Sequence, residues 1–183
     1  MKLIAISGKI NSGKDELACK IFEYLKRKGI KYEHLKFASG LKQMVSILTG
    51  GDLEDQYSDG GKEKVVDELG MTNGTLQQVV GTLLREKLHP DIWTFPVLKF
   101  ARVNPDTVCV ISDCRFQNEA DLIKQNGGVI IRLNRKNRNI GKRNPNHISE
   151  TDLDDYKNFD LVIENDGTVE EMIQKAFTFL DFK

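Results

Sequence analysis

The chain has 183 residues, 39% of them hydrophobic, which is enough to bury one ordinary core without disulfides or a structural metal. Lysine plus arginine number 27, as do aspartate plus glutamate, so the overall charge provides no attraction to nucleic acid or to an anionic membrane. The amino-terminal apolar run is too short for a signal sequence, and no stretch approaches the roughly 18 apolar residues of a membrane span. We therefore expect one cytoplasmic domain that binds neither membrane nor nucleic acid; a homodimer is compatible with this composition.

The cysteines are Cys19, Cys109 and Cys114, an odd number without CxxC or Cys/His spacing. Neither a disulfide framework nor a zinc site fits that arrangement. We expect reduced and mostly buried thiols.

The first predicted strand is the apolar run Leu3 to Ile6, which leads into Gly8. A helix is predicted next, because apolar residues recur at helical spacing until Gly29: Leu17, Ala18, Ile21, Phe22 and Leu25. The order strand, glycine loop, helix follows from this pattern.

A second strand is predicted at residues 32–38, where Leu35 and Phe37 alternate with polar residues as in an edge strand with one wet face. Three further apolar runs predict buried strands, at Val108 to Ile111, Val129 to Leu133 and Leu161 to Ile163. Helical patterns follow the first and the last of these runs, at Phe116, Ala120 and Ile123 and at residues 169–180. This alternation predicts a three-layer α/β fold with a five-stranded parallel sheet flanked by helices.

Two segments interrupt the alternation. Residues 39–105 are too long for a crossover and carry their own helical pattern between Leu76 and Leu84, so they are interpreted as a helical insertion. Residues 134–149 are polar and show no apolar periodicity, which indicates a loop or lid. The remaining segments, 1–38, 106–133 and 150–183, form the predicted core.

Residues 8–15 have the sequence Gly-Lys-Ile-Asn-Ser-Gly-Lys-Asp, so the pattern G-x-x-x-x-G-K lies between a predicted strand and a predicted helix. Glycines let consecutive backbone N–H groups turn toward phosphate oxygens, and Lys14 can reach the β- and γ-phosphates of ATP. The pattern predicts a nucleotide site in a P-loop NTPase fold, with a chance glycine turn as the alternative. Its residues are Gly8, Lys9, Asn11, Ser12, Gly13, Lys14, Asp15 and Glu16.

Two carboxylates are candidates for a Mg²⁺ site. Asp15 stands where Ser or Thr usually ligates the ion, although a helix N-terminal carboxylate is an alternative interpretation. Asp113 closes an apolar strand as a Walker B carboxylate does, with an N-cap before Phe116 as its alternative.

Ligands of parallel α/β sheets bind beyond the carboxyl ends of the strands. Arg115 lies there and could face an acceptor phosphate or Glu119 one turn later. Between Asp121 and Glu150 no residue is acidic, yet Lys124, Arg132, Arg135, Lys136, Arg138, Lys142 and Arg143 all occur. This concentration favours a lid that closes over the triphosphate with Arg135 and Arg138 at the transferring group, rather than a solvated or RNA-binding loop.

In the insertion, Lys42, Arg85, Asp91 and Trp93 could bind the base and phosphate of an acceptor. Against this, tryptophan is more often a core residue and arginine often a surface ion-pair partner.

Two short motifs remain. His147 and Glu150 could touch nucleotide or cap the next element. Asn165 to Thr168 joins the last strand to the last helix, with Thr168 a plausible cap and Asn165 and Gly167 near adenine, although a purely structural role is sufficient for this turn.

Taken in order, these motifs resemble the bacteriophage-type deoxynucleoside monophosphate kinases, of the nucleoside monophosphate kinase group. The resemblance covers nearly the whole chain, through residues 3–15, 37–42, 81–85, 90–93, 113–121, 127–133, 147–150 and 165–168. It implies transfer of the ATP γ-phosphoryl group to a dNMP, giving dNDP and ADP, with Mg²⁺ at Asp15 and Asp113. It also implies that Lys42, Arg85 and Asp91 hold the acceptor. The full set of predicted substrate contacts is Lys42, Arg85, Asp91, Trp93, Asp113, Arg115, Glu119, His147 and Glu150.

One turn departs from the pattern of similar sequences, which often carry an arginine near Thr72, whereas this chain has Thr72-Asn73-Gly74. That weakens the substrate assignment more than the kinase assignment. The alternatives are a P-loop kinase for another acceptor, such as dephospho-coenzyme A or phosphomevalonate, and a nucleotide- or RNA-binding module without catalysis.

Overall fold

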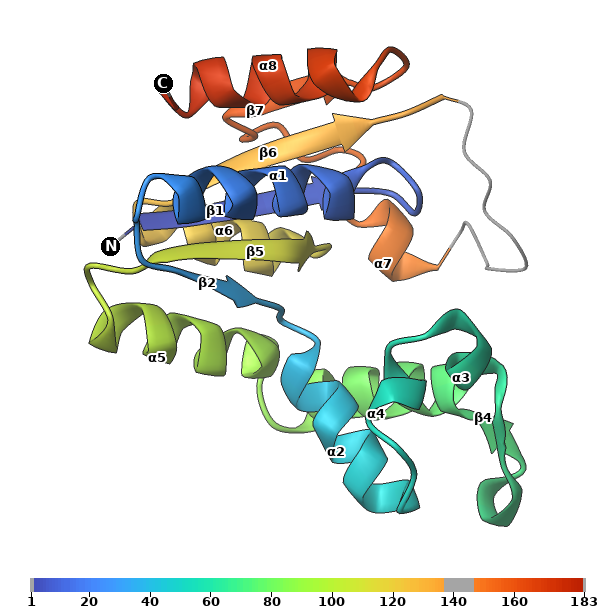
Figure 1. Ribbon diagram of the computed structural model, residues 1–183. Helices are drawn as coiled ribbons and strands as arrows, with labels where there is room; N and C mark the ends of the chain where they lie inside the picture. Colours follow the sequence, from blue (N-terminus) through green and yellow to red (C-terminus); the bar gives the residue numbers. More distant parts are fainter. Residues whose placement is uncertain (1, 137–146, 183) are drawn as a thin grey trace. The chain divides into compact units, whose positions relative to one another are not determined.

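A computed structural model describes residues 2–136 and 147–182 (Figure 1). It contains two compact units, which are described separately: residues 1–36 with 98–183, and residues 37–97. The second unit ends at Val97, within the segment 39–105 that was predicted as an insertion, because most of helix α5 (Phe95–Val103) belongs to the first unit.

The first unit is built on a parallel sheet of five strands. They are β1 (Lys2–Gly8), β2 (Tyr32–Leu35), β5 (Val108–Cys114), β6 (Val129–Asn134) and β7 (Leu161–Glu164). Their order is β2-β5-β1-β6-β7, and every neighbouring pair is parallel. The predicted five-stranded parallel sheet is confirmed, with β2 at an edge as its alternating pattern indicated.

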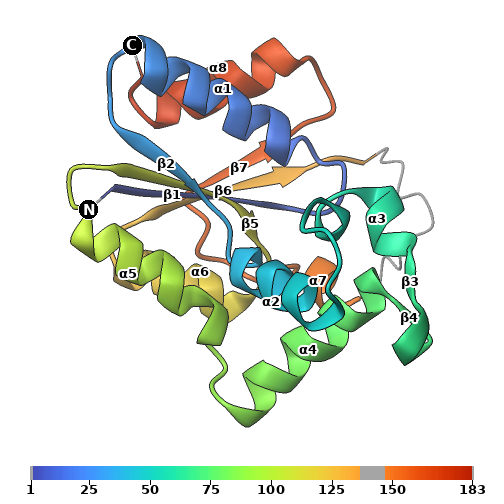
Figure 2. The same cartoon turned by 60° about the horizontal axis from the view of Figure 1, so that its bottom comes forward.

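Helices cover both faces of this sheet (Figure 2). On one face lie α1 (Lys14–Arg27) and α8 (Val169–Phe179), and on the other lie α6 (Gln117–Gln125) and the carboxyl-terminal part of α5. The helical spacing of Leu17, Ile21 and Leu25 puts all three on the buried side of α1, where they share a core with residues of β1, β6 and α8. This packing fixes α1 directly behind the loop that precedes it.

A short helix, α7 (Ile148–Thr151), precedes β7. The sequence did not predict it, because four residues are too few to show a helical period.

The three cysteines are free; Cys109 and Cys114 are buried as expected, whereas Cys19 is exposed on α1. In the described part of the chain, no helix combines the length and apolar character that crossing a bilayer requires.

The second unit is mainly helical, as predicted. It contains α2 (Ser39–Thr49), η1 (Glu54–Gln56), α3 (Asp59–Glu63), η2 (Asp67–Leu69), α4 (Asn73–Lys87) and η3 (Ile92–Thr94). Strands β3 (Val65–Val66) and β4 (Met71–Thr72) form a small antiparallel ladder. The Thr72 hydroxyl accepts a hydrogen bond from Thr75 N at 3.2 Å and caps α4, so Asn73 and Gly74 open that helix.

Candidate active site

The glycine-rich loop lies at the topological switch point of the sheet. Strand β1 is central, and the chain places β5 on one side of it and β6 on the other. Crossovers that leave in opposite directions open a crevice at the carboxyl end of the strand between them, which is where ligands of such sheets bind. Residues 8–14, which connect β1 to α1, occupy this end.

The backbone of the loop requires glycine at two positions. Gly13 has φ +100°, and a Cβ there would lie 2.6 Å from Asn165 Nδ2. A Cβ on Gly8 would lie 2.6 Å from the carbonyl oxygen of Leu133. Helix α1 begins immediately after Gly13, so its first N–H groups point into the loop and suit an anion.

Asn165 connects the turn after β7 to this loop. Its Nδ2 donates to the carbonyl oxygen of Ser12 at 2.9 Å, and the side chain is buried. Thr168 caps α8, accepting from Glu171 N at 3.2 Å, and Glu171 fills the space that a side chain at position 167 would need.

Lys14 is buried at the start of α1 with only 7% of its surface exposed. Its Nζ donates to the carbonyl oxygen of Lys9 at 2.6 Å. The pKa of Lys14 is lowered to about 8, first by burial and then by the neighbouring Arg115, whereas Glu150 and Asp15 oppose the shift. A buried cation beside a glycine-rich loop, at the start of a helix, is suited to bind a polyphosphate.

The sequence offered Glu119 as a partner of Arg115. The ion pair that the Arg115 guanidinium forms is with Glu150. The second oxygen of Glu150 accepts a hydrogen bond from Ile10 N at 2.8 Å. The predicted acceptor contacts Arg115 and Glu150 therefore lie together beside the phosphate loop.

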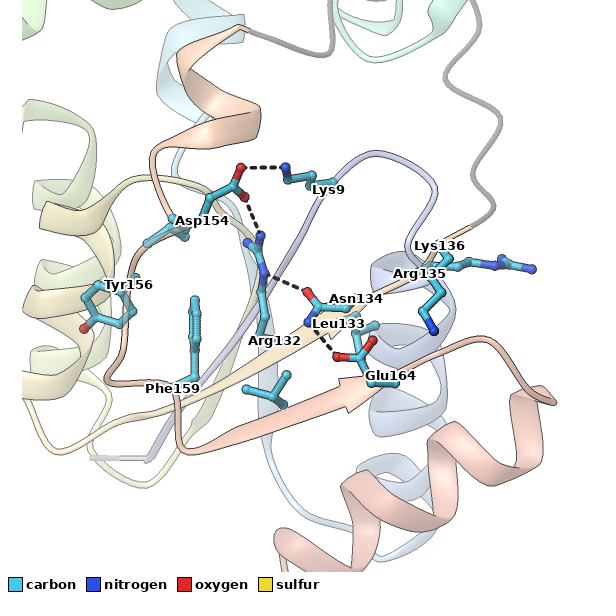
Figure 3. Close-up of a pocket in the computed structure, with 12 residues that line it drawn as sticks. Lys9, Arg132, Leu133, Asn134, Arg135, Lys136, Asp154, Tyr156, Phe159 and Glu164 are labelled. Carbon is cyan, nitrogen blue, oxygen red and sulfur yellow. Dashed lines mark hydrogen bonds and ion pairs between the residues drawn. The ribbon is translucent and has the colours of Figure 1, made fainter.

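Arg132, which the sequence placed only within a basic run, is a buried part of the site (Figure 3). Its guanidinium donates to Ser7 Oγ at 3.0 Å and to Asp154 Oδ1 at 3.3 Å. Asp154 in turn accepts from Lys9 Nζ at 2.6 Å. The dashed contacts of Figure 3 thus form a chain from the loop to the sheet.

A pocket of about 400 Å³ adjoins this chain of contacts, between β6, β7 and the segment that leads into β7. It is lined by Lys9, Arg132, Leu133, Asn134, Arg135, Lys136, Leu153, Asp154, Tyr156, Phe159, Val162 and Glu164. Arg135 is exposed at its rim. Arg138, together with Lys142 and Arg143, lies outside the described residues.

The two predicted metal carboxylates have an environment that fits Mg²⁺. Asp15 is exposed on the first turn of α1, and Asp113 is half-buried in β5. Both act on His34: burial and then Lys36 lower the pKa of that imidazole, while Asp113 and Asp15 raise it. Within residues 2–136 and 147–182, no group of three or more His, Cys, Asp or Glu side chains could hold a metal alone. Mg²⁺ in kinase sites takes one or two carboxylates with waters and substrate phosphates, which these two residues match.

Glu119 and His147 satisfy backbone groups at helix starts. Glu119 is buried and accepts from Arg115 N at 2.9 Å and Phe116 N at 3.2 Å, so the start of α6 is capped from within the helix rather than by Asp113. His147 Nδ1 accepts from Ser149 N at 3.2 Å and caps α7. These contacts favour structural roles for Glu119 and His147 over the substrate contacts that the sequence suggested. They also show that the alternative role of Asp113 as the N-cap of α6 is wrong.

In the second unit, Trp93 is a core residue, with its indole N–H donating to the carbonyl oxygen of Gly81 at 3.2 Å. Its burial favours packing over the predicted stacking on a base. Arg85 donates to the carbonyl oxygen of Pro90 at 3.3 Å, and Lys42 Nζ lies 3.8 Å from the centre of the Tyr57 ring. Arg85, Lys42 and Asp91 are all partly exposed.

The sheet order, the glycine-rich loop at the central strand and the buried lysine together define a P-loop NTPase fold. The fold agrees with that of shikimate kinase from Aquifex aeolicus, with a TM-score of 0.52, 13% identity, and 99% of this chain and 96% of that chain covered. The deoxynucleotide monophosphate kinase family matches residues 65–176. A protein of Acanthamoeba polyphaga mimivirus, provisionally named a deoxynucleotide monophosphate kinase, is 32% identical over 99% of this chain and 97% of its own length. The chain belongs to the deoxynucleotide monophosphate kinase family, and it is a nucleotide kinase.

Proposed function

We propose that this enzyme transfers the γ-phosphoryl group of ATP to a deoxynucleoside monophosphate. The bond between the γ-phosphorus and its bridging oxygen breaks, an acceptor phosphate oxygen forms the new bond, and the products are ADP and dNDP. The observation that carries the proposal is the buried Lys14 within a glycine loop, with Arg115 and Arg132 close by. Family membership supports the choice of acceptor.

The chain's own groups act through position and charge, because phosphoryl transfer requires little covalent chemistry from the protein. Loop N–H groups and Lys14 hold the β- and γ-phosphates, and Arg115 and Arg135 stabilise charge on the transferring group, with Arg138 proposed for the same role. Asp15 and Asp113 would hold Mg²⁺, which would neutralise part of the phosphate charge. We assign the reaction to the cytoplasm, or to the host cytoplasm if the protein is viral.

A panel of acceptors tests the reaction. With ATP and Mg²⁺ present, ADP release should be observed with at least one dNMP and should exceed release with dephospho-coenzyme A or phosphomevalonate. No turnover with any dNMP would remove the proposal. Salt-sensitive RNA binding without phosphoryl transfer would instead identify a binding module.

The dependence on pH follows from Lys14. Its charged form binds the triphosphate, and its pKa in the free enzyme is lowered to about 8. Raising the pH through that value removes the charge, so kcat/KM for ATP should fall above pH 8, approaching tenfold per pH unit, because this ratio reports the free enzyme. Steady-state rates at saturating dNMP from pH 6.5 to 9.5 measure it, and a profile that is flat up to pH 9.5 would contradict the role of Lys14.

We propose Lys42, Arg85 and Asp91 as contacts of the acceptor, because these partly exposed side chains offer two cations and one hydrogen-bond acceptor. Arg85→Ala should raise the KM for dNMP roughly tenfold or more while the KM for ATP changes little, since removing a contact to one substrate weakens binding of that substrate. Arg102→Ala, a change at an exposed arginine of α5, is the matched control. Equal effects of Arg85→Ala on both KM values would count against the assignment.

A further inference from the structure

One short segment, residues 150–154, contacts the phosphate loop at two adjacent residues, Lys9 and Ile10. Glu150 in α7 accepts a hydrogen bond from Ile10 N at 2.8 Å. Asp154, four positions later, accepts one from Lys9 Nζ at 2.6 Å. Side chains from the region before β7 therefore hold the first residues of the loop, in addition to helix α1, which follows the loop.

Each of these carboxylates also holds an arginine. The other oxygen of Glu150 pairs with Arg115. The other oxygen of Asp154 accepts from Arg132 Nη2 at 3.3 Å (Figure 3). The Arg132 side chain is only 8% exposed and also donates to Ser7 at the end of β1. We call Glu150 and Asp154 the carboxylate bracket, because each joins one arginine to one residue of the phosphate loop.

The segment that carries the bracket is held in place by hydrogen bonds and packing. Asp152, between its two members, accepts from Gln117 N at 2.7 Å, and Gln117 Nε2 donates to the carbonyl oxygen of Asp152 at 2.8 Å. Leu153 is buried. The segment is thereby docked on the start of α6, so the carboxylates are held in place by packing and hydrogen bonds, as positioning groups need to be.

The contacts of Glu150 keep it ionised beside a site for anions. Burial raises its pKa, but Arg115, the Ile10 N–H and Lys14 outweigh that effect, and the pKa is lowered overall. A carboxylate that is fully paired in this way neutralises the neighbouring cations until a phosphate arrives and does not compete for the reacting atoms.

We propose that the carboxylate bracket positions the ATP site: Asp154 fixes Lys9 so that the loop receives the triphosphate, and Glu150 aims Arg115 at the phosphate bound there. Glu150 is thus a positioning residue and not the acceptor contact that the sequence suggested. The inference rests on the proposed kinase activity.

Two isosteric variants, Glu150→Gln and Asp154→Asn, test the bracket, with Asp155→Asn at an exposed neighbouring acid as the matched control. Asp154→Asn should raise the KM for ATP and the Kd for ADP about tenfold and leave the KM for dNMP unchanged. Glu150→Gln should lower kcat by roughly 10- to 100-fold, because a small displacement of a charged group costs that much. Asp155→Asn should match the wild type.

Hydrogen exchange and a double-mutant cycle separate positioning from general stability. The amides of residues 9 and 10 should exchange faster in both variants, while amides of β1 stay unchanged. If Glu150 acts through Arg115, Glu150→Gln combined with Arg115→Gln should be no slower than Arg115→Gln alone.

Wild-type kinetics and exchange in both variants would overturn the proposal, and so would a rise in the KM for dNMP that equals the rise for ATP. Should Glu150→Gln fail to fold, Asp154→Asn still decides, since Asp154 is 39% exposed. If the wild type phosphorylates no dNMP, the kinase function fails, whereas ADP affinity and hydrogen exchange still support or refute the bracket.

Discussion

Replacing Lys14 with methionine is expected to lower kcat/KM for ATP by about 1,000-fold or more, because it removes the buried positive charge that faces the transferring phosphate. Methionine keeps most of the buried stem, so the core behind α1 stays filled. Burial lowers the pKa of Lys14, which means that folding disfavours its charge, and the variant should unfold at the same temperature as the wild type or higher. ADP release and thermal unfolding measure the two effects.

The matched control for this change is Lys20→Met, at a lysine of the same helix whose described partner is Glu23 on the surface. A surface pair of this kind contributes little to stability, so the variant should keep wild-type turnover. If Lys14→Met retained more than a tenth of the activity, the phosphate-loop assignment would be wrong. Loss of folding in Lys14→Met alone would indicate that the side chain serves the core.

The central strands β1, β5 and β6 could be predicted from sequence because they are buried on both faces. Runs such as Val108 to Ile111 are apolar at every position, and each is followed by a turn or a helix with a clear period. Strand β5 continues past the predicted end to Cys114. The prediction stopped early because Ser112 and Asp113, at the end of the strand that opens onto the site, are polar. A polar strand end and a loop look alike in a sequence.

The second unit was harder to predict in detail. In α2, Leu41, Met44, Val45 and Leu48 recur at helical spacing, a signal for a further helix in the insertion that was not used; Val45 is the buried side chain of this helix. The strands β3 and β4 have two residues each, and two residues carry no alternation. The insertion was recognisable by length, whereas its two short strands depended on tertiary packing.

The loop itself was predictable, because glycine spacing and flanking elements are local. Arg132 and Asp154 were not recognised as site residues, since their partners lie far away in sequence: Arg132 contacts Ser7, and Asp154 contacts Lys9. Arg132 was counted in a basic segment because charge patterns do not reveal burial. An arginine at an inward-facing position of a strand can be recognised as buried only when its polar partner on the neighbouring strand is known.

Replacing Gly13 with alanine is expected to lower kcat/KM for ATP by at least about 100-fold, because loop N–H groups must stay aimed at the phosphates. At φ +100° an L residue is strained, and the new Cβ would lie 2.6 Å from Asn165 Nδ2. That amide is buried and bonded to Ser12, so it cannot move aside without losing its hydrogen bond. ATP affinity by calorimetry and turnover by ADP release measure the loss.

Gly29→Ala is the control that separates strain from site geometry. Gly29 also has a positive φ, +65°, but no heavy atom lies within 4 Å of a Cβ built there. Its substitution should reduce the free energy of unfolding by about 1–2 kcal/mol and leave ATP affinity unchanged. If Gly13→Ala merely destabilised the fold to a similar extent and bound ATP normally, the phosphate loop would tolerate displacement of Asn165. The link between the turn after β7 and the nucleotide would then have to be abandoned, although Lys14 would keep its role.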